Sequence, residues 1–250
     1  MDTVDRFTTK AEHYVRYRWD YAPEAFVALR DHAHLSAFTR VADIGSGPGT
    51  IARHLINQVA RIDAIEPNGA MRQMAQRTLG TLPNLEFLDA LASETTLPDR
   101  SVDLITVGRA LHWFPRVSTR QEFQRILVPG GWLAIFKVSC SNPDLLKAME
   151  SLKTKTLGWD SSTPAGKIDP PLLSFYFGHE HYQILEFPHR QQERLSDFLG
   201  RLTSKSHAPD PGYPAYPRFQ EAVKAIFAQF AHDDLLTLDL STELVLGQIC

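Results

Sequence analysis

The chain has 250 residues, 43% of them hydrophobic and 22% charged, and this ordinary globular composition excludes a predominantly disordered protein. The formal net charge of −3 disfavours nucleic-acid binding, because a duplex-binding protein usually presents a positive field. The two cysteines, Cys140 and Cys250, are too few for a disulfide scaffold or a cysteine-rich zinc site.

The N-terminal residues 1–14 are polar, and no stretch approaches the roughly 18 apolar residues of a membrane-spanning helix. We therefore expect no secretory signal, no membrane partner and a cytoplasmic location.

Strand-like and helical segments alternate after an amphipathic helix that is predicted at 23–33. Short runs rich in Val, Ile and Leu predict strands at 40–45, 61–66, 84–90, 102–108 and 132–138. Amphipathic segments predict helices between them at 50–58, 68–79 and 119–127. Strands separated by helices form βαβ crossovers, so the pattern predicts an α/β fold with a doubly wound, mostly parallel sheet and helices on both faces.

The second half of the chain has a different pattern. Helices are predicted at 143–155, 192–205 and 217–231, and the last run, 235–249, predicts a strand that completes the sheet. Residues 157–180 and 206–217 are rich in Pro, Gly and aromatic side chains, and we interpret them as loops.

The most informative motif runs from Asp43 to Thr50, where a strand passes through three alternate glycines, Gly45, Gly47 and Gly49, into a helix. Glycine permits a sharp turn and the close approach of a ligand, and the start of the following helix favours an electronegative ligand group. The spacing differs from the G-x-G-x-x-G fingerprint of dinucleotide sites. The acid before the glycines would repel a pyrophosphate but not a ligand that carries an ammonium or a sulfonium.

Two acids follow the next strands. Glu66 lies 21 residues after Gly45 at the end of the second strand, where a carboxylate can accept both hydroxyls of a ribose. Alternatively, it is an acid favoured by the dipole of the helix that follows. Asp89 ends the third strand and either accepts from an exocyclic amine such as that of adenine or serves as a turn residue.

Taken together, these segments resemble the class I S-adenosylmethionine-dependent methyltransferases. The resemblance rests on DIGSGPGT, the acid in AIEPNGAM, the LDA at the third strand end, ALHWF and VPGGWLAIF, and its core covers about residues 41–138. FTTKAEHYVRYRWDYAP, SKSHAP and LDLSTELVLGQI are similar to a type-11-like small-molecule branch that includes trans-aconitate methyltransferase-like enzymes. Trp19 stands where that branch usually has Pro.

The resemblance implies a Rossmann-like fold with a seven-stranded sheet and a helical and loop cap, and S-adenosyl-L-methionine as the cofactor. It implies a single domain, with N-terminal cap helices at 1–38, the cofactor-binding core at 39–138, cap and substrate segments with a sixth strand at 139–235, and the final strand at 236–250. We expect a monomer or homodimer.

The resemblance also implies a set of cofactor-binding residues. These are Tyr14, Arg18, Gly45, Ser46, Gly47, Glu66, Pro67, Met71, Asp89, Ala90, Gly108 and Arg109. The glycine turn would touch the methionine part, Glu66 would hold the ribose, and the ends of the second and third strands would flank the adenine. The residues after the fourth strand, Ala110 included, would line the cofactor, and the N-terminal Tyr and Arg would close over it.

His112 is the candidate catalytic residue, as a base or substrate orienter, because it follows the fourth strand at the carboxyl edge of the sheet and titrates near neutrality. A sulfonium methyl is already a strong electrophile, so positioning and the exclusion of water supply most of the rate. A base helps only where the acceptor carries a proton. His112 and Trp113 could instead wall the pocket or bond locally, and Trp113 and Phe114 could be packing residues or substrate clamps.

The expected reaction is methyl transfer by in-line displacement to a small molecule, at oxygen in a carboxylate or hydroxyl, with a nitrogen or carbon acceptor as the alternative. A nucleic-acid acceptor is not expected, because GRALHWF replaces the Asn/Asp-Pro-Pro-Tyr/Phe signature after the fourth strand; Asp169-Pro-Pro is interpreted as a loop. The alternatives are a non-catalytic cofactor-binding or partner subunit and an NAD(P)-dependent reductase, for which no Tyr-x-x-x-Lys pair is present.

Two further groups of side chains are open to two interpretations, and a third group, of histidines, is not interpreted as a metal site. His207 is a second polar candidate or a loop histidine. An aromatic set forms a lid over the acceptor or an ordinary cap core; it consists of Trp159, Phe175, Tyr176, Phe177, Tyr213 and Tyr216. The spacing of His179, His181 and His189 fits no standard metal site.

Overall fold

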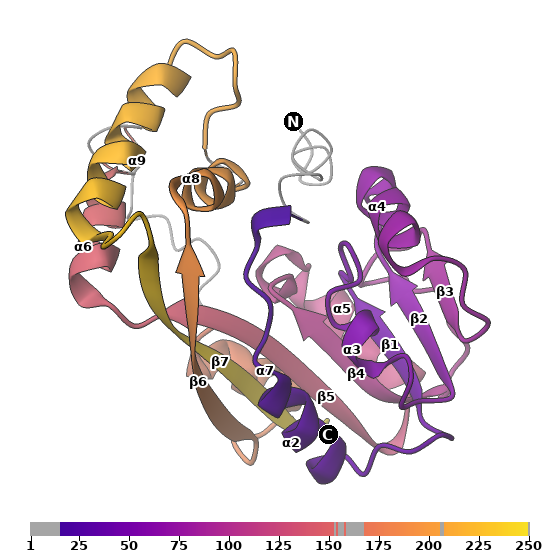
Figure 1. Cartoon of the computed structure of the whole chain (residues 1–250). Helices are drawn as coiled ribbons and strands as arrows, with labels where there is room; N and C mark the ends of the chain where they lie inside the picture. Colours follow the sequence, from indigo (N-terminus) through magenta and orange to yellow (C-terminus); the bar gives the residue numbers. More distant parts are fainter. Residues whose placement is uncertain (1–15, 153, 155–157, 159–167, 206–207, 250) are drawn as a thin grey trace.

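A seven-stranded sheet runs through the computed structural model, which describes residues 16–152, 154, 158, 168–205 and 208–249 (Figure 1). Its strands are β1 (Arg40–Ile44), β2 (Arg61–Ile65), β3 (Leu85–Leu88), β4 (Val102–Gly108), β5 (Leu127–Cys140), β6 (Gln183–Glu193) and β7 (Leu236–Gln248). They lie in the order β3-β2-β1-β4-β5-β7-β6. The first five pair in parallel, and β7 is antiparallel to both of its neighbours.

This order confirms the predicted Rossmann-like α/β class. The connections turn in opposite directions from β1 and from β4, and a crevice forms at the carboxyl ends of strands where the direction of winding reverses. The glycine turn follows β1 at this point.

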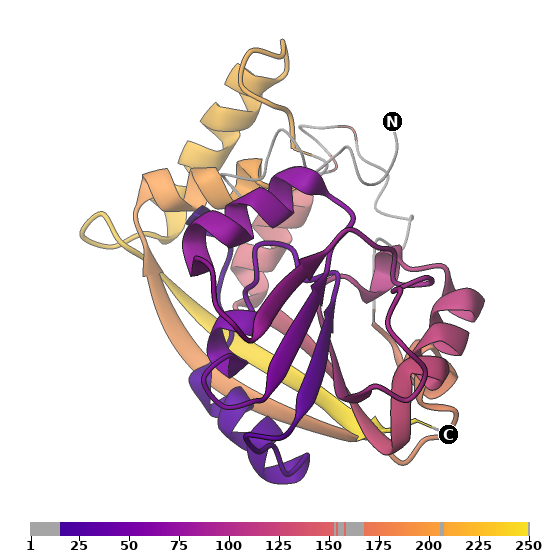
Figure 2. The same ribbon diagram turned by 90° about the vertical axis from the view of Figure 1, so that its right-hand side faces the viewer.

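Helices cover both faces of the sheet (Figure 2). The helices of the described residues are α2 (Pro23–His32), α3 (Ala52–Leu55), α4 (Gly69–Leu79), the 3-10 helix η2 (Leu111–Trp113), α5 (Arg116–Ile126), α6 (Pro143–Ser151), α7 (Pro170–Phe177), α8 (Leu195–Thr203) and α9 (Tyr216–Phe230). One apolar cluster joins α2 and α3 to the sheet, and another joins α5 and α7 to its opposite face. The central strands are apolar on both sides because both sides are covered. None of the described helices is long and apolar enough to cross a bilayer.

A third apolar cluster forms the cap, made of α6, α8 and α9 with the first part of β7. β5, β6 and β7 have 14, 11 and 13 residues, whereas β1 and β2 have five each, so the long strands extend to the cap. In Figure 1 the three helices gather at the upper left, on the far side of residues 16–22 from α4.

The interpretation of residues 157–180 as a loop is wrong for α7. Asp169 caps this helix by accepting a hydrogen bond from the Leu172 N–H at 3.0 Å, with two prolines in the first turn. Tyr176 and Phe177 are fully buried and belong to the apolar cluster that joins α5 and α7 to the sheet. They therefore form core rather than a lid.

The other members of the aromatic set also lie apart. Phe175 packs against the same cluster as its two neighbours, Tyr216 packs in the cap, and Tyr213 is 62% exposed. Trp159 lies outside the described residues. The described aromatic side chains thus do not form one lid.

Several predicted boundaries also differ. α3 has four residues instead of nine, and residues 192–193 end β6 rather than begin a helix. β5 begins at Leu127, five residues early, and takes in the Pro129–Gly131 turn signal. The pairing of β4 with β5 shifts register here, because Val102 pairs with Leu127 but Leu104 pairs with Trp132. The extra residues of β5 therefore form an irregularity in the ladder.

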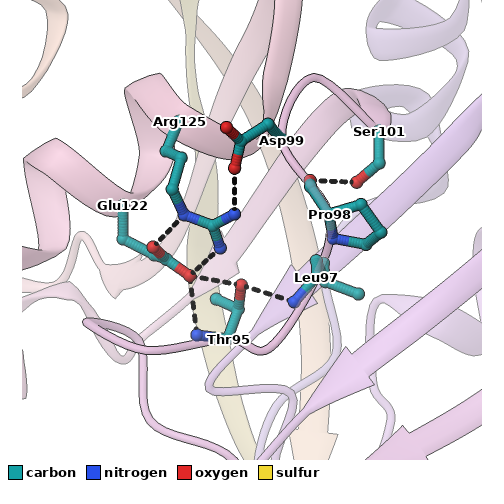
Figure 3. Close-up of polar contacts among 7 residues, drawn as sticks. All are labelled: Thr95, Leu97, Pro98, Asp99, Ser101, Glu122 and Arg125. Carbon is teal, nitrogen blue, oxygen red and sulfur yellow. Dashed lines mark hydrogen bonds and ion pairs between the residues drawn. The ribbon is translucent and has the colours of Figure 1, made fainter.

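A polar network ties the β3–β4 connection to α5 (Figure 3). Glu122 is 8% exposed and accepts hydrogen bonds from the N–H and hydroxyl of Thr95 at 2.7 and 2.6 Å. Arg125 donates to both oxygens of Glu122 and, at 2.6 Å, to Asp99. Burial by itself raises the pKa of Glu122, but the donors outweigh burial and lower that pKa to about 2.

Candidate active site

A pocket lies where β1 and β4 end. It is formed by the glycine turn, the residues that end β4, and one residue from the N-terminal side, and it holds about 260 Å³ of space, including space open to solvent. Its walls are Tyr21, Asp43, Gly45, Ser46, Gly47, Pro48, Thr50, Ile51, Gly108 and Arg109. Five of the predicted contact residues therefore share one pocket.

Two glycines of the turn serve different purposes. Both have positive φ, +66° at Gly45 and +55° at Gly47, which favours glycine. A Cβ on Gly45 would come within 2.5 Å of the Ala110 side chain, so this glycine permits close packing. A Cβ on Gly47 would meet nothing within 4 Å, so this position faces open space that a ligand can fill.

Asp43 lines this pocket as a buried carboxylate, 1% exposed. Its Oδ1 accepts a hydrogen bond from the Thr106 hydroxyl at 2.9 Å. The backbone N–H of Ala52 lies near enough to lower the pKa of Asp43, but no donor of the described residues meets Oδ2 in full hydrogen-bond geometry. Burial raises the pKa of Asp43 to about 7. A cationic ligand group would compensate for the water that this oxygen has lost. The sequence motif identified Asp43 as an electrostatic signal, but the predicted contact set left it out.

Glu66 is held beside the glycine turn. Its Oε2 accepts from the Gly47 N–H and its Oε1 from the Asn68 N–H, both at 2.9 Å. Burial raises the pKa of Glu66, and these two hydrogen bonds partly offset that shift. The Asn68 side chain caps α4 by accepting from the Met71 N–H at 3.0 Å, so the helix has a cap other than Glu66.

Arg72 joins the ends of β2 and β3, and the predicted contact set did not include it. Its guanidinium donates to the Glu66 carbonyl at 2.6 Å and to the Asp89 carboxylate at 2.5 Å. Met71 and Ala90 are buried nearby in sequence, and Pro67 is half-buried. Arg72 follows Glu66 by six residues in the sequence, but this spacing alone does not show that its side chain reaches Asp89.

An N-terminal strap, residues 16–22, forms another wall of the pocket. Tyr21 is 3% exposed and lies against Gly108, where a Cβ would come within 2.6 Å of the tyrosine oxygen. Arg109 has φ +56° and stacks on the Tyr21 ring, with 4.9 Å between the guanidinium carbon and the ring centroid. It also donates to the Trp19 carbonyl at 2.8 Å. Tyr21 is a pocket residue that the sequence analysis missed, although it lies two residues before the predicted helix.

The strap is also fixed to the cap, which accounts for tryptophan at position 19. The Trp19 indole N–H donates to Glu193 at 2.7 Å, and the Arg201 guanidinium lies 4.1 Å from the Trp19 ring centroid. Glu193 and Arg201 form an ion pair in which each side chain is 2% exposed. Tyr17 packs so closely on Gly200 of α8 that a Cβ there would clash at 2.5 Å.

His112 lies exposed in η2, with its ring centroid 4.8 Å from that of Trp113. Desolvation by the surrounding chain, aided by the charge of Arg18, lowers the pKa of His112. The imidazole is therefore neutral at pH 7 and can accept a proton. The charge of Arg18 therefore acts on the His112 imidazole, and its contact with the cofactor stays a prediction. Tyr14 and His207 lie outside the described residues.

The described residues contain no group of three His, Cys, Asp or Glu side chains that could hold a metal ion. His179, one of the three histidines considered above, forms a hydrogen bond with the Gln248 carbonyl oxygen at 3.0 Å.

Comparison with known proteins identifies the family. A family model described as a methyltransferase domain matches residues 42–135. A Dictyostelium discoideum protein named as a methyltransferase is 30% identical over 217 residues, 85% of this chain and 79% of that protein. An uncharacterised methyltransferase of Mycobacterium tuberculosis is 33% identical over 122 residues, 49% of this chain and 47% of its own length.

The fold is shared with a solved structure from Anaeromyxobacter dehalogenans, titled a type II methyltransferase, with a TM-score of 0.61 at 20% identity over 93% of this chain and 98% of that chain. Together with the glycine turn and the strand order, these matches show that the chain belongs to the class I S-adenosylmethionine-dependent methyltransferases.

Proposed function

We propose that this protein transfers the methyl group of S-adenosylmethionine to an oxygen atom of a small molecule, a carboxylate or a hydroxyl. The observation that carries the cofactor site is the unpartnered buried Oδ2 of Asp43 in the same pocket as the open position at Gly47. A pocket whose wall holds a buried carboxyl group fits a ligand that carries an ammonium and a sulfonium, because their positive charge favours the ionised carboxylate, and it disfavours a pyrophosphate.

Glu66 is arranged to hold the ribose. Each of its oxygens accepts one backbone N–H, and each keeps a lone pair that can accept a hydroxyl. The two backbone bonds fix the carboxylate before the ligand arrives, so little side-chain entropy is lost on binding. Asp89, at the end of β3, is assigned to the exocyclic amine of adenine.

The bound cofactor supplies an activated methyl group on sulfur. The residues of this chain bind and orient the reactants and exclude water, and these effects lower the barrier to in-line displacement. A neutral His112 can take the proton from a hydroxyl acceptor, whereas a carboxylate acceptor is already ionised at pH 7 and needs no base. The pH profile of turnover therefore distinguishes the two kinds of acceptor.

Two features support a small acceptor over a macromolecule. The cap helices pack on the extended ends of β5 to β7, and the strap that forms one wall of the pocket is bonded to the cap through Trp19 and Glu193, so the cap lies beside the site. The net charge of −3 does not supply the positive field that a nucleic-acid acceptor requires. The similarity of the N-terminal strap and the tail to the trans-aconitate methyltransferase-like branch favours carboxylates as the first acceptors to test.

The experiment has two stages. Calorimetry with S-adenosylmethionine and, separately, with NADH tests the cofactor; failure of the folded protein to bind the former would refute the proposal, and tight binding of NADH alone would favour a reductase. A library of small carboxylic acids and alcohols is then screened for formation of S-adenosylhomocysteine. Saturable binding with no turnover across the library would favour a non-catalytic cofactor-binding subunit.

A further inference from the structure

A single arginine bridges the two strand ends that carry the acids of the cofactor site. Arg72 lies in the first turn of α4 and its side chain is 19% exposed. One guanidinium nitrogen donates to the Glu66 carbonyl at 2.6 Å, and the other donates to Asp89 Oδ2 at 2.5 Å. The guanidinium therefore fixes the spacing between the end of β2 and the end of β3.

Asp89 needs such support, because its side chain is 69% exposed. An exposed carboxylate samples several rotamers, and ordering it on contact with a ligand lowers the affinity. The ion pair orders the carboxylate beforehand and engages Oδ2, so Oδ1 is the oxygen that is left for a donor on the ligand. A partner of this kind converts a mobile acid into a directed hydrogen-bond acceptor.

We propose that Arg72 is a positioning residue that makes this cofactor site selective for adenine, by holding Asp89 ready to accept from the exocyclic amine. This inference rests on the proposed function, because it takes Asp89 as the adenine contact. Its charge also offsets the repulsion between the carboxylates of Glu66 and Asp89, which would otherwise oppose their use in one site. The planar guanidinium meets two acceptors in fixed directions, which the point charge of a lysine does not reproduce.

The test compares two ligands that differ at the base. S-Adenosylhomocysteine carries the exocyclic amine, and S-inosylhomocysteine carries a carbonyl oxygen in its place. By calorimetry, we expect the native protein to prefer the adenosyl ligand by about 10-fold or more, the range for a hydrogen bond to a charged group. In Arg72→Met the preference should fall to within about 3-fold, and Arg72→Lys should restore part of it.

The matched control is Arg77→Met, which removes an exposed arginine from the same helix and should leave the preference unchanged. Circular dichroism establishes that each variant is folded. Equal weakening of both ligands by Arg72→Met would show a purely structural role and would overturn the inference, as would an unchanged preference. No binding of S-adenosylhomocysteine by the native protein would instead refute the proposed function, and this inference with it.

Discussion

Replacing Gly47 by alanine tests the pocket most directly. In the absence of ligand the new methyl group meets nothing within 4 Å, so the folded protein pays only for the positive φ of +55°, about 1–2 kcal/mol. With cofactor bound, the methyl group occupies space that the ligand needs. Overpacking of this kind costs about 1–3 kcal/mol, so we expect the dissociation constant for S-adenosylhomocysteine to rise by about 5- to 150-fold.

Gly80→Ala is the matched control. Gly80 also has positive φ, +72°, and open space around its Cβ position, but it lies at the opposite end of α4 from Asn68 and Met71. Urea denaturation should show a loss of stability in both variants, and calorimetry should show a loss of affinity in Gly47→Ala alone. An unchanged dissociation constant in Gly47→Ala would refute the placement of the ligand at the glycine turn.

Three more substitutions have defined outcomes. Glu66→Ala should weaken S-adenosylhomocysteine binding by about 1–3 kcal/mol in calorimetry, through lost charge-assisted hydrogen bonds, and unchanged affinity would contradict the ribose assignment. His112→Ala should lower turnover of a hydroxyl acceptor more than it lowers cofactor affinity; an equal effect on both would exclude a base role. Glu122→Gln should lower the free energy of unfolding at pH 7 by about 2–3 kcal/mol. The folded pKa of about 2 lies below the ordinary glutamate pKa of 4.5, so the contribution of Glu122 to stability is full above pH 4.5 and is lost as the pH falls toward 2. The free energies of unfolding of the two proteins, measured in urea, should therefore converge in acid. A constant difference at all pH values would contradict that pKa.

Local pattern predicted the sheet core well because its signals are short-range. The runs at 40–45, 61–66 and 102–108 became β1, β2 and β4 within a residue, since buried parallel strands are uniformly apolar. α7 was missed because a Pro-rich composition suggested a loop, although Asp169 followed by two prolines is a helix start.

Local pattern also predicts some of the site residues and misses others. Gly45, Gly47 and Glu66 come together because each follows a parallel strand, and parallel strands bring their carboxyl ends to one edge. Tyr21 and Arg72 could not be assigned from pattern alone. The role of Tyr21 depends on how the strap packs against Gly108, and that of Arg72 depends on the spacing between two strand ends. Both roles therefore depend on tertiary structure.

The strap depends on partners that lie far along the chain. The indole of Trp19 bonds to a carboxylate 174 positions further along the chain, and the Ala22 N–H bonds to Thr242, 220 positions away. A nascent chain emerging from the ribosome therefore lacks the groups that hold Tyr21 against the pocket until Glu193 and Thr242 have been made. Cofactor affinity should accordingly arise only after β7 has been synthesised, and removal of β7 should abolish it even though every glycine of the turn is retained.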